Sequence, residues 1–301
     1  MRIEIVTVPY RYDEPREGLG AGPDALLAAG LQARLVSIGC EVAEPVAAYL
    51  DPAVKQEGRT ALNIGTLGAE TARLVAAACR QGHGALVLAG DDTAAIGVVS
   101  GLQQAAGAGA RIGVVWIDAH GDFNTPETSF SGILAGMPVA ILAGLAGPLW
   151  REAAGLAAPV PTDRIILAGT RELDDKEREL LSSTEVRVVP AGELRGDDRF
   201  AGVIRWLAGR CDLLYLHVDL DVLDPRFVPS ASTPSADGLT IEELVAVMGM
   251  VLATGKVAAT AVSSLNPGAG SRGARALAST MKTLEGAMSS WSAAPAVARP
   301  A

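Results

Sequence analysis

Three short stretches of the sequence place acidic side chains directly after apolar runs. They are Asp91 and Asp92, then Asp118, His120 and Asp122, and finally Asp219 and Asp221. So many like charges could not ionise together in one pocket unless positive charge lay among them. Mixed carboxylate and imidazole ligands suit divalent ions such as Mn²⁺, and a pair of ions could activate a water molecule as a nucleophile. The sequence therefore predicts a metal centre if the three runs end side by side.

Each of these residues also has an ordinary structural interpretation. Asp92 or Thr93 could cap the N-terminus of the helix that starts there, and Asp-x-Asp after a strand is a common turn former. His120 on its own would more often be a structural histidine. The metal hypothesis is favoured because independent turn residues would rarely follow three apolar runs in this way.

The elements that must position these residues are short strands alternating with helices. The predicted strands are 3–8, 41–44, 85–89, 112–117, 164–168, 186–189, 213–218 and 257–262. Most are continuous apolar runs, which is typical of strands buried on both faces. The segments 66–80, 93–104 and 241–252 show helical spacing, and Thr240 with Glu243 forms a capping box.

This alternation predicts a three-layer α/β/α fold, with a parallel sheet of roughly eight strands covered by helices on both faces. Functional groups in such sheets gather at the carboxyl ends of the strands, where all three acidic stretches lie. We expect a single domain over residues 1–288 and a loosely ordered tail over 289–301, which is rich in Ala, Pro and Ser.

Composition narrows the classes of partner. The formal net charge of -9 argues against nucleic acid, since a phosphate backbone requires clustered Lys and Arg. No apolar run approaches the ~18 residues needed to cross a bilayer, and the N-terminus lacks a signal-peptide pattern. The three cysteines have no CxxC spacing, so a disulfide framework is not expected. We therefore predict a cytoplasmic protein with no membrane partner.

Four long motifs resemble those of the ureohydrolase family, which contains arginases and agmatinases. Residues 8–31 resemble its N-terminal glycine-rich loop and first helix. AGDDTAAIG (89–97), IDAHGDFNTPETSFSG (117–132) and VDLDVLDPRFVPSASTP (218–234) resemble its three metal motifs. The resemblance covers nearly the full length and implies the same fold, a small amino-acid-like substrate, about two Mn²⁺ per chain, and a homo-oligomer, either trimer or hexamer.

The resemblance also implies roles for individual residues. The metal ligands would be Asp118, His120, Asp122, Asp219 and Asp221, with Asp92 as a candidate sixth. Asp122 and Asp219 would bridge the ions. Asp122, His120 and Thr233 would lie at the reacting centre, and Asn124, Ser131 and Asp174 would contact the substrate's α-carboxylate and α-amino groups. The alternative for Asn124 and Ser131 is that they merely organise a loop.

Three departures from the family pattern bear on activity. Asp92 stands where the family has a histidine, so one metal site could be weak or empty. Ala135 stands where arginases have a histidine that shuttles protons, and proton transfer of that kind contributes ~10²–10⁴-fold. Neither His83, before a strand, nor His217, within one, is a good replacement. Ser264 stands where a glutamate would pair with a guanidinium, which weakens arginine and agmatine as substrates.

Two functions remain open on these grounds. The first is a metal-dependent hydrolase, acting through a metal-bridging hydroxide on the C–N bond of an amidine, modified guanidine or amide, with Ser264 and Thr233 lining the reacting end. The second is a catalytically impaired homologue that binds a ligand or serves as an oligomer partner.

Overall fold

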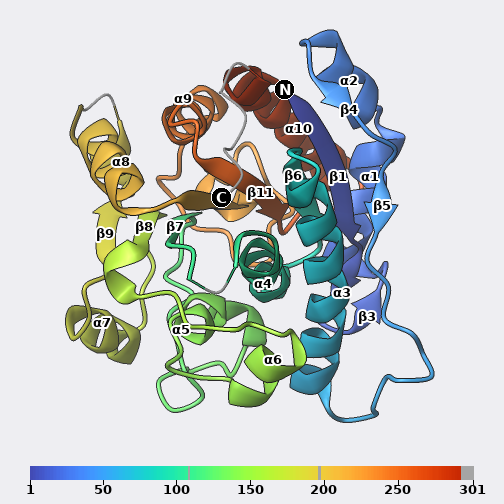
Figure 1. The fold of residues 1–301 in the computed structure, drawn as a ribbon. Helices are drawn as coiled ribbons and strands as arrows, with labels where there is room; N and C mark the ends of the chain where they lie inside the picture. Colours follow the sequence, from blue (N-terminus) through green and yellow to red (C-terminus); the bar gives the residue numbers. More distant parts are fainter. Residues whose placement is uncertain (108, 196–197, 293–301) are drawn as a thin grey trace.

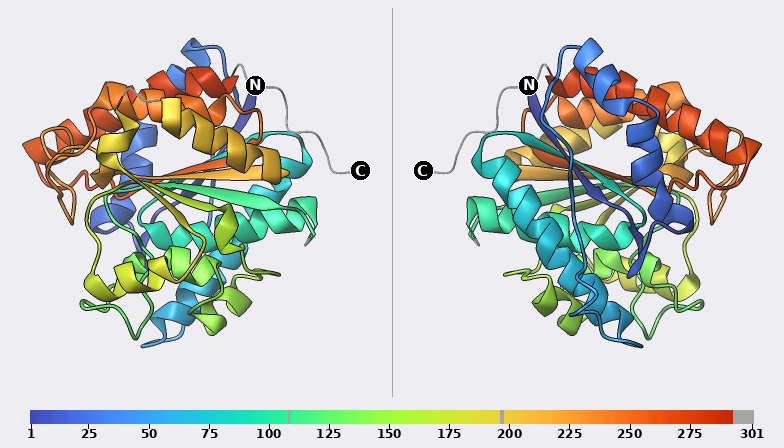
Figure 2. Two further views of the ribbon diagram at one scale, coloured as in Figure 1. Left: turned by 90° about the vertical axis from the view of Figure 1, so that its left-hand side faces the viewer. Right: turned by 90° about the vertical axis from the view of Figure 1, so that its right-hand side faces the viewer.

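The computed structural model describes residues 1–107, 109–195 and 198–292. A nine-stranded sheet runs through its centre, and every strand pair in it is parallel. Two layers of helices cover the sheet, one on each face (Figure 2). The predicted three-layer α/β/α architecture is therefore confirmed.

The sheet has the strand order β4-β1-β6-β11-β10-β7-β8-β9, with β5 also paired to β1. Its strands are β1 (Arg2–Val8), β4 (Glu41–Val42), β5 (Val46–Ala47), β6 (Gly84–Ala89), β7 (Ile112–Ile117), β8 (Ile165–Thr170), β9 (Arg187–Pro190), β10 (Leu213–Asp219) and β11 (Val257–Ser263). All eight predicted strands are present within a few residues of their expected bounds. The short β5 was not predicted, because its two residues carry no periodic signal.

The three strands that precede the acidic stretches, β6, β7 and β10, are not all neighbours in the sheet. The strands before the second and third acidic stretches, β7 and β10, are neighbours, but β11 lies between β10 and β6. Ser263 and Ser264, at the end of β11, are therefore placed between the acidic stretches. A second, two-stranded sheet, β2 (Tyr10–Arg11) with β3 (Glu14–Pro15), shapes the N-terminal loop near the same edge.

The helices divide into two groups by the face they cover (Figure 1). One face packs against α1 (Gly22–Ala28), α2 (Leu31–Ser37), α8 (Asp198–Arg210), α9 (Ile241–Leu252) and α10 (Ser271–Ser292). The other packs against α3 (Thr60–Arg80), α4 (Ala95–Ala106), α5 (Pro138–Leu142), α6 (Pro148–Ala153) and α7 (Asp175–Ser182). Both faces of the central strands are consequently buried, as their continuous apolar runs predicted.

One predicted helix boundary matches the structure, and two differ from it. Helix α9 spans the predicted 241–252, and its Thr240–Glu243 capping box is formed in both directions. Helix α3 begins at Thr60, six residues before its predicted start. Helix α4 begins at Ala95, after a 3₁₀ turn over Asp92–Ala94.

The C-terminal boundary differs from the prediction. Helix α10 continues to Ser292, so residues 289–292 are helical, although we expected the tail to begin at 289. Trp291 explains the difference, because its side chain is fully buried and its Nε1–H donates to the Val257 carbonyl at 3.2 Å. Residues 293–301 lie outside the described part of the chain. In that part, no helix is both long and apolar enough to cross a membrane.

Candidate metal centre

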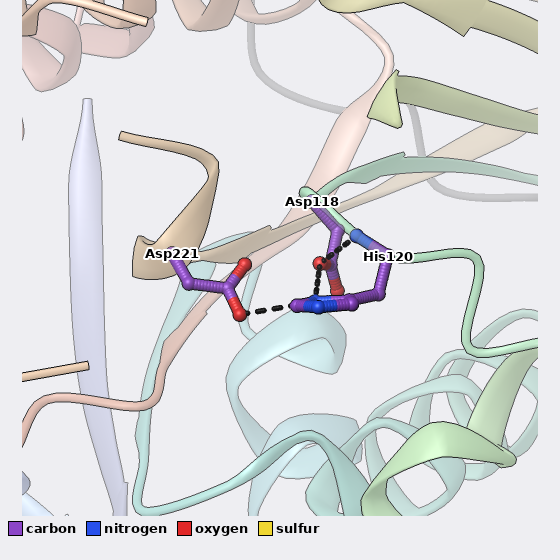
Figure 3. Close-up of side chains that lie close together, drawn as sticks. All are labelled: Asp118, His120 and Asp221. Carbon is purple, nitrogen blue, oxygen red and sulfur yellow. Dashed lines mark hydrogen bonds and ion pairs between the residues drawn. The ribbon is translucent and has the colours of Figure 1, made fainter. Parts of the chain in front are cut away.

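The three acidic stretches meet at the carboxyl edge of the sheet. Figure 3 shows the part formed by β7 and β10, where the His120 ring lies between two carboxylates. Its Nδ1 is 3.1 Å from Asp221 Oδ2 and 3.4 Å from Asp118 Oδ1. Asp118 is fixed from two further sides, since it accepts the His120 N–H at 2.7 Å and the Trp116 Nε1–H at 2.9 Å.

Two groups of side chains have ligand atoms close enough together to hold an ion. One is Asp118, His120 and Asp221; the other is Asp92, Asp118 and Asp122. Asp118 belongs to both groups, whereas Asp122 belongs to one. The side chain common to the two groups is thus Asp118, and the bridging roles expected for Asp122 and Asp219 stay predictions.

The metal-free centre holds more negative charge than it can keep ionised. Burial, with the charge of Asp221 added, raises the pKa of Asp118 to about 7, and burial raises the pKa values of Asp122 and Asp219 well above the ordinary range. Burial lowers the pKa of His120, but hydrogen bonds to Asp118 and Asp221 outweigh it and raise that pKa to about 11. The centre therefore binds protons in the place of cations.

One oxygen of the centre is without a partner. Asp122 Oδ2 is buried and has no hydrogen bond among the described residues. Asp122 also holds an unusual backbone φ of +48°. A buried, unpaired carboxylate oxygen costs free energy unless a cation or donor meets it. Together with the mixed carboxylate and imidazole donors, this oxygen shows that the residues present fit divalent ions.

Asp91 settles the alternative role considered for Asp92. Asp91, not Asp92 or Thr93, caps the turn that leads into α4, since its Oδ1 accepts the Thr93 N–H at 2.9 Å. Its Oδ2 accepts the Tyr12 N–H at 2.6 Å and so ties the N-terminal loop to the centre. Capping by Asp91 leaves the Asp92 side chain for the group with Asp118 and Asp122.

Close approach of the N-terminal loop depends on Gly90. A Cβ at this position would lie 2.0 Å from the Tyr10 carbonyl oxygen, so only glycine lets the two backbones touch. This contact places Arg11 and Tyr12 at the same cavity as the carboxylates.

His217 is the functional candidate that the sequence analysis dismissed. Its Nε2 lies 3.0 Å from Asp92 Oδ1, and its ring stacks on Trp116 with centroids 3.5 Å apart. Burial lowers its pKa, against the opposing effect of Asp92. Strand periodicity was the available signal, because it puts Tyr215, His217 and Asp219 on one face of β10. The partner, Asp92, is distant in sequence and could not be found this way.

A cavity of about 450 Å³ opens over the carboxylates. Its lining includes every predicted substrate residue: Asn124, Ser131, Asp174, Thr233 and Ser264. Among the described residues that line it, Arg11 is the single Arg or Lys side chain. The sequence analysis did not identify Arg11, because its place depends on the fold of the N-terminal loop.

Two hydroxyl groups contact the carboxylates of the centre. Thr233 Oγ1 donates to Asp221 Oδ2 at 2.9 Å, and Ser264 Oγ donates to Asp219 Oδ2 at 2.6 Å. Ser264 has a φ of +69°, a region that favours glycine, and its N–H donates to the Gly90 carbonyl. The structure thus brings Thr233 to one of the metal-capable groups and Ser264 to Asp219, a carboxylate at the same cavity.

At the far end, the structure joins two residues expected to contact the substrate head. Asn124 Nδ2 donates to Asp174 Oδ2 at 3.1 Å, and Asp174 also begins α7 as a capping-box residue. Asn124 accepts the Thr128 hydroxyl, which organises the loop after β7. Ser131 is exposed at the cavity rim and accepts the Ile133 N–H at 3.3 Å. The contacts observed at these positions organise the loop after β7, and contact with a substrate head stays a prediction.

Two positioning residues were missed from the sequence. Glu177 is buried; its Oε1 accepts the Phe123 N–H at 2.8 Å and it packs on Gly121, so it fixes the loop that carries Asp122. The Asp174-x-x-Glu177 capping-box spacing was a usable signal. Arg171 donates to the carbonyl groups of Asp221 and Ser235 at 2.8 and 3.0 Å, which anchors the loop after β10.

Comparison with known proteins gives one consistent result. Residues 1–285 match the model of the Arginase family. The sequence is 31% identical over 277 residues to the arginase of Bacillus caldovelox, covering 88% of this chain and 91% of that one. It is likewise 31% identical to human arginase-1, over 89% of this chain and 86% of that one.

Solved structures agree with the sequence matches. The crystal structure of Bacillus caldovelox arginase superimposes with a TM-score of 0.84 and 28% identity, over 95% of this chain and 97% of that one. The formimidoylglutamase of Bacillus subtilis superimposes with a TM-score of 0.74 at 16% identity, over 98% of this chain and 88% of that one, which shows a shared fold alone.

Proposed function

Because the chain belongs to the arginase family, we propose that it is a metal-dependent hydrolase that cleaves a C–N bond in an amidine, a modified guanidine or an amide carried by an amino-acid-like substrate. The observation that carries this proposal is the pair of metal-capable groups sharing Asp118 at one end of the 450 Å³ cavity. Mn²⁺ is the ion to test first, since carboxylate and imidazole ligands suit it.

Each side of the cavity has a separate task. A pair of bound divalent ions would supply Lewis-acid polarisation and an activated water. Asp92, Asp118, His120, Asp122, Asp219 and Asp221 would hold the ions. Thr233 and Ser264 orient the carboxylates of Asp221 and Asp219 beside the reacting group. At the other end, Asn124, Ser131 and Asp174 bind the substrate head, and Arg11 offers a cation for a carboxylate.

The charge at the reacting end favours a neutral group over a guanidinium. Ser264 brings no carboxylate, and its hydroxyl proton is already donated to Asp219. A guanidinium would therefore lack the bidentate, charge-assisted partner that such cations use. We expect arginine and agmatine to be poorer substrates than a less basic amidine or amide.

Tyr12 supplies the proton donor that Ala135 cannot. Its side chain lines the same cavity as Ala135, and the Ala135 backbone lies close enough to its phenol group to act on its pKa. Burial and the charge of Asp91 raise the pKa of Tyr12, and the Ala135 backbone opposes this rise only in part. The phenol therefore keeps its proton. The Asp91 hydrogen bond to its backbone holds the residue at a φ of +58°. We propose that Tyr12 Oη, protonated and on the cavity wall, donates a proton to the leaving nitrogen.

A Tyr12→Phe variant tests this role. We expect kcat to fall by about 10²-fold or more with KM changed little, because the substituted group acts in proton transfer rather than in ground-state binding. Steady-state kinetics on the best substrate measures both constants. Tyr49→Phe is the matched control, since Tyr49 is 60% exposed and should leave both constants unchanged. An unaltered kcat in Tyr12→Phe would remove Tyr12 from the mechanism.

The proposed function is tested by turnover. Protein loaded with Mn²⁺ is assayed for ammonia, urea or amine release from amino acids that bear linear amidine, modified guanidine or amide side chains, with arginine and agmatine alongside. We expect a neutral or weakly basic member to exceed arginine. No turnover anywhere with two ions bound per chain would favour a ligand-binding or oligomer-partner protein, the function suggested by the losses at Ala135 and Ser264.

Restoring the two missing groups should shift activity towards arginine. In an Ala135→His, Ser264→Glu double variant, we expect urea release from arginine to rise about tenfold or more, because a carboxylate can pair with the guanidinium and an imidazole can carry a proton. The matched control is Ala135→His with Ser264→Gln, which has similar size without the charge. An equal rise in both double variants would contradict the charge argument.

A further inference from the structure

His217 occupies a fully buried position behind the candidate metal centre. In the sheet it is registered between Trp116 of β7 and Ala261 of β11, so the small alanine on one side and the flat indole on the other leave room for its ring. The two rings are nearly parallel, at 7°. Both ring nitrogens have partners: Nδ1 is 2.7 Å from the Tyr215 hydroxyl, and Nε2 is 3.0 Å from Asp92 Oδ1.

The chemistry of these partners fixes the direction of the hydrogen bonds. A neutral imidazole has one N–H donor and one acceptor nitrogen, whereas an ionised carboxylate can only accept. Nε2 must therefore carry the hydrogen and donate to Asp92, which leaves Nδ1 to accept from the Tyr215 O–H. The result is a continuous chain from Tyr215 through His217 to Asp92, with each donor matched to an acceptor.

Asp92 is held through one of its two oxygens. Its Oδ1 accepts from His217 and also from Ser263 Oγ at 2.7 Å. Two donors on the same atom fix the rotation of the carboxylate, so that Oδ2 is the oxygen available to an ion in the group with Asp118 and Asp122. Such support behind a ligand is typically worth 10–100-fold in metal affinity.

We propose that His217, oriented by Tyr215, is a positioning residue that makes Asp92 a competent metal ligand. Metal sites commonly place a carboxylate behind a ligating histidine. Here the order is reversed, because a histidine lies behind a carboxylate. The imidazole that the first motif lacks at position 92 is thus present one layer further from the ion, on β10. This inference rests on the proposed metal centre.

Metal binding tests the inference directly. Mn²⁺ stoichiometry and dissociation constants are measured by calorimetry on the full chain, and the ligand-field spectrum is recorded with Co²⁺ in place of Mn²⁺. We expect His217→Ala to weaken one of two ions by about 10–100-fold and to change the Co²⁺ spectrum. His217→Gln, which can still donate a hydrogen bond to Asp92, should recover much of the affinity. Tyr215→Phe should weaken the same ion.

Tyr10→Phe is the matched control for Tyr215→Phe. Tyr10 is also buried, but its hydroxyl accepts the Leu50 N–H at 3.1 Å, so its loss should leave both ions and the spectrum unchanged. Should His217→Ala fail to fold, Tyr215→Phe and His217→Gln still decide the matter. Wild-type affinity and spectrum in Tyr215→Phe, with Gln no better than Ala at position 217, would overturn the inference. A wild-type protein that binds no ion would instead overturn the metal centre itself.

Discussion

An Asp118→Asn variant is expected to lose both metal ions and to lower kcat by more than about 10³-fold. Asp118 is the residue common to the two metal-capable groups, and asparagine keeps its shape while it removes the charge. Loss of water activation and of Lewis-acid polarisation removes several kcal/mol of transition-state stabilisation, and each ~1.4 kcal/mol is a factor of ten in rate. Elemental mass spectrometry gives the ions per chain, and steady-state kinetics gives kcat.

Comparison with Asp122→Asn makes this prediction specific. Asp122 belongs only to the group that also contains Asp92 and Asp118. Its variant should therefore lose one ion and keep the ion held by Asp118, His120 and Asp221. Asp51→Asn is a control of the same chemical change at an exposed carboxylate, and it should bind both ions. Loss of both ions from Asp122→Asn, with one retained in Asp118→Asn, would contradict this prediction and identify Asp122 as the bridging residue.

Affinity for Mn²⁺ is expected to fall steeply with acidification, by about 10- to 100-fold for each pH unit between about pH 8 and about pH 6. Each proton that the ion must displace contributes a factor of ten per pH unit. In the metal-free centre His120, whose pKa is raised to about 11, holds a proton throughout this range, and Asp118 gains one as the pH falls through about 7. Burial shifts the pKa values of Asp122 and Asp219 in the same direction as that of Asp118. Calorimetry across this range, in buffers of different protonation enthalpy, counts the protons released.

The same pKa shifts set the sign of the stability of the metal-free protein. The pKa of Asp118 rises on folding from 3.8 to about 7, so the folded state binds more protons than the unfolded state between these values. Its contribution to the free energy of unfolding is therefore fully present below about pH 4 and is lost as the pH rises through about 7. Thermal unfolding with a chelator should show this decline, and saturating Mn²⁺ should remove it. A metal-free protein whose stability rises through that window would contradict the assignment.

The sequence predicted those parts of the fold whose signals are local. Continuous apolar runs located every strand of the sheet except the two-residue β5, and the capping box at Thr240 located the start of α9. The carboxyl-edge rule placed the three acidic stretches together, because it depends on strand direction and not on strand order. The end of α10 was misjudged, since burial of Trp291 outweighs the Ala, Ser and Pro composition around it.

Pairings between distant residues could not be predicted. The contact between Asp92 and His217 spans 125 positions and needs β6, β11 and β10 to be ordered side by side. The same holds for Tyr12, which reaches the cavity through the contact of Gly90 with Tyr10. At position 92 the sequence shows only that a histidine is missing, whereas the structure places the imidazole of His217 3.0 Å from Asp92.

The place of β11 has a consequence for the order in which the protein can assemble during synthesis. Its residues, 257–263, emerge late from the ribosome, yet β11 alone joins the half-sheet β4-β1-β6 to the half-sheet β10-β7-β8-β9. Asp118, His120 and Asp221 all belong to the second half, so their ion-binding group can form on a nascent chain before β11 exists. Asp92 belongs to the first half and can join only afterwards. The metal-capable group that contains Asp92 is therefore complete only when β11 has joined the two half-sheets.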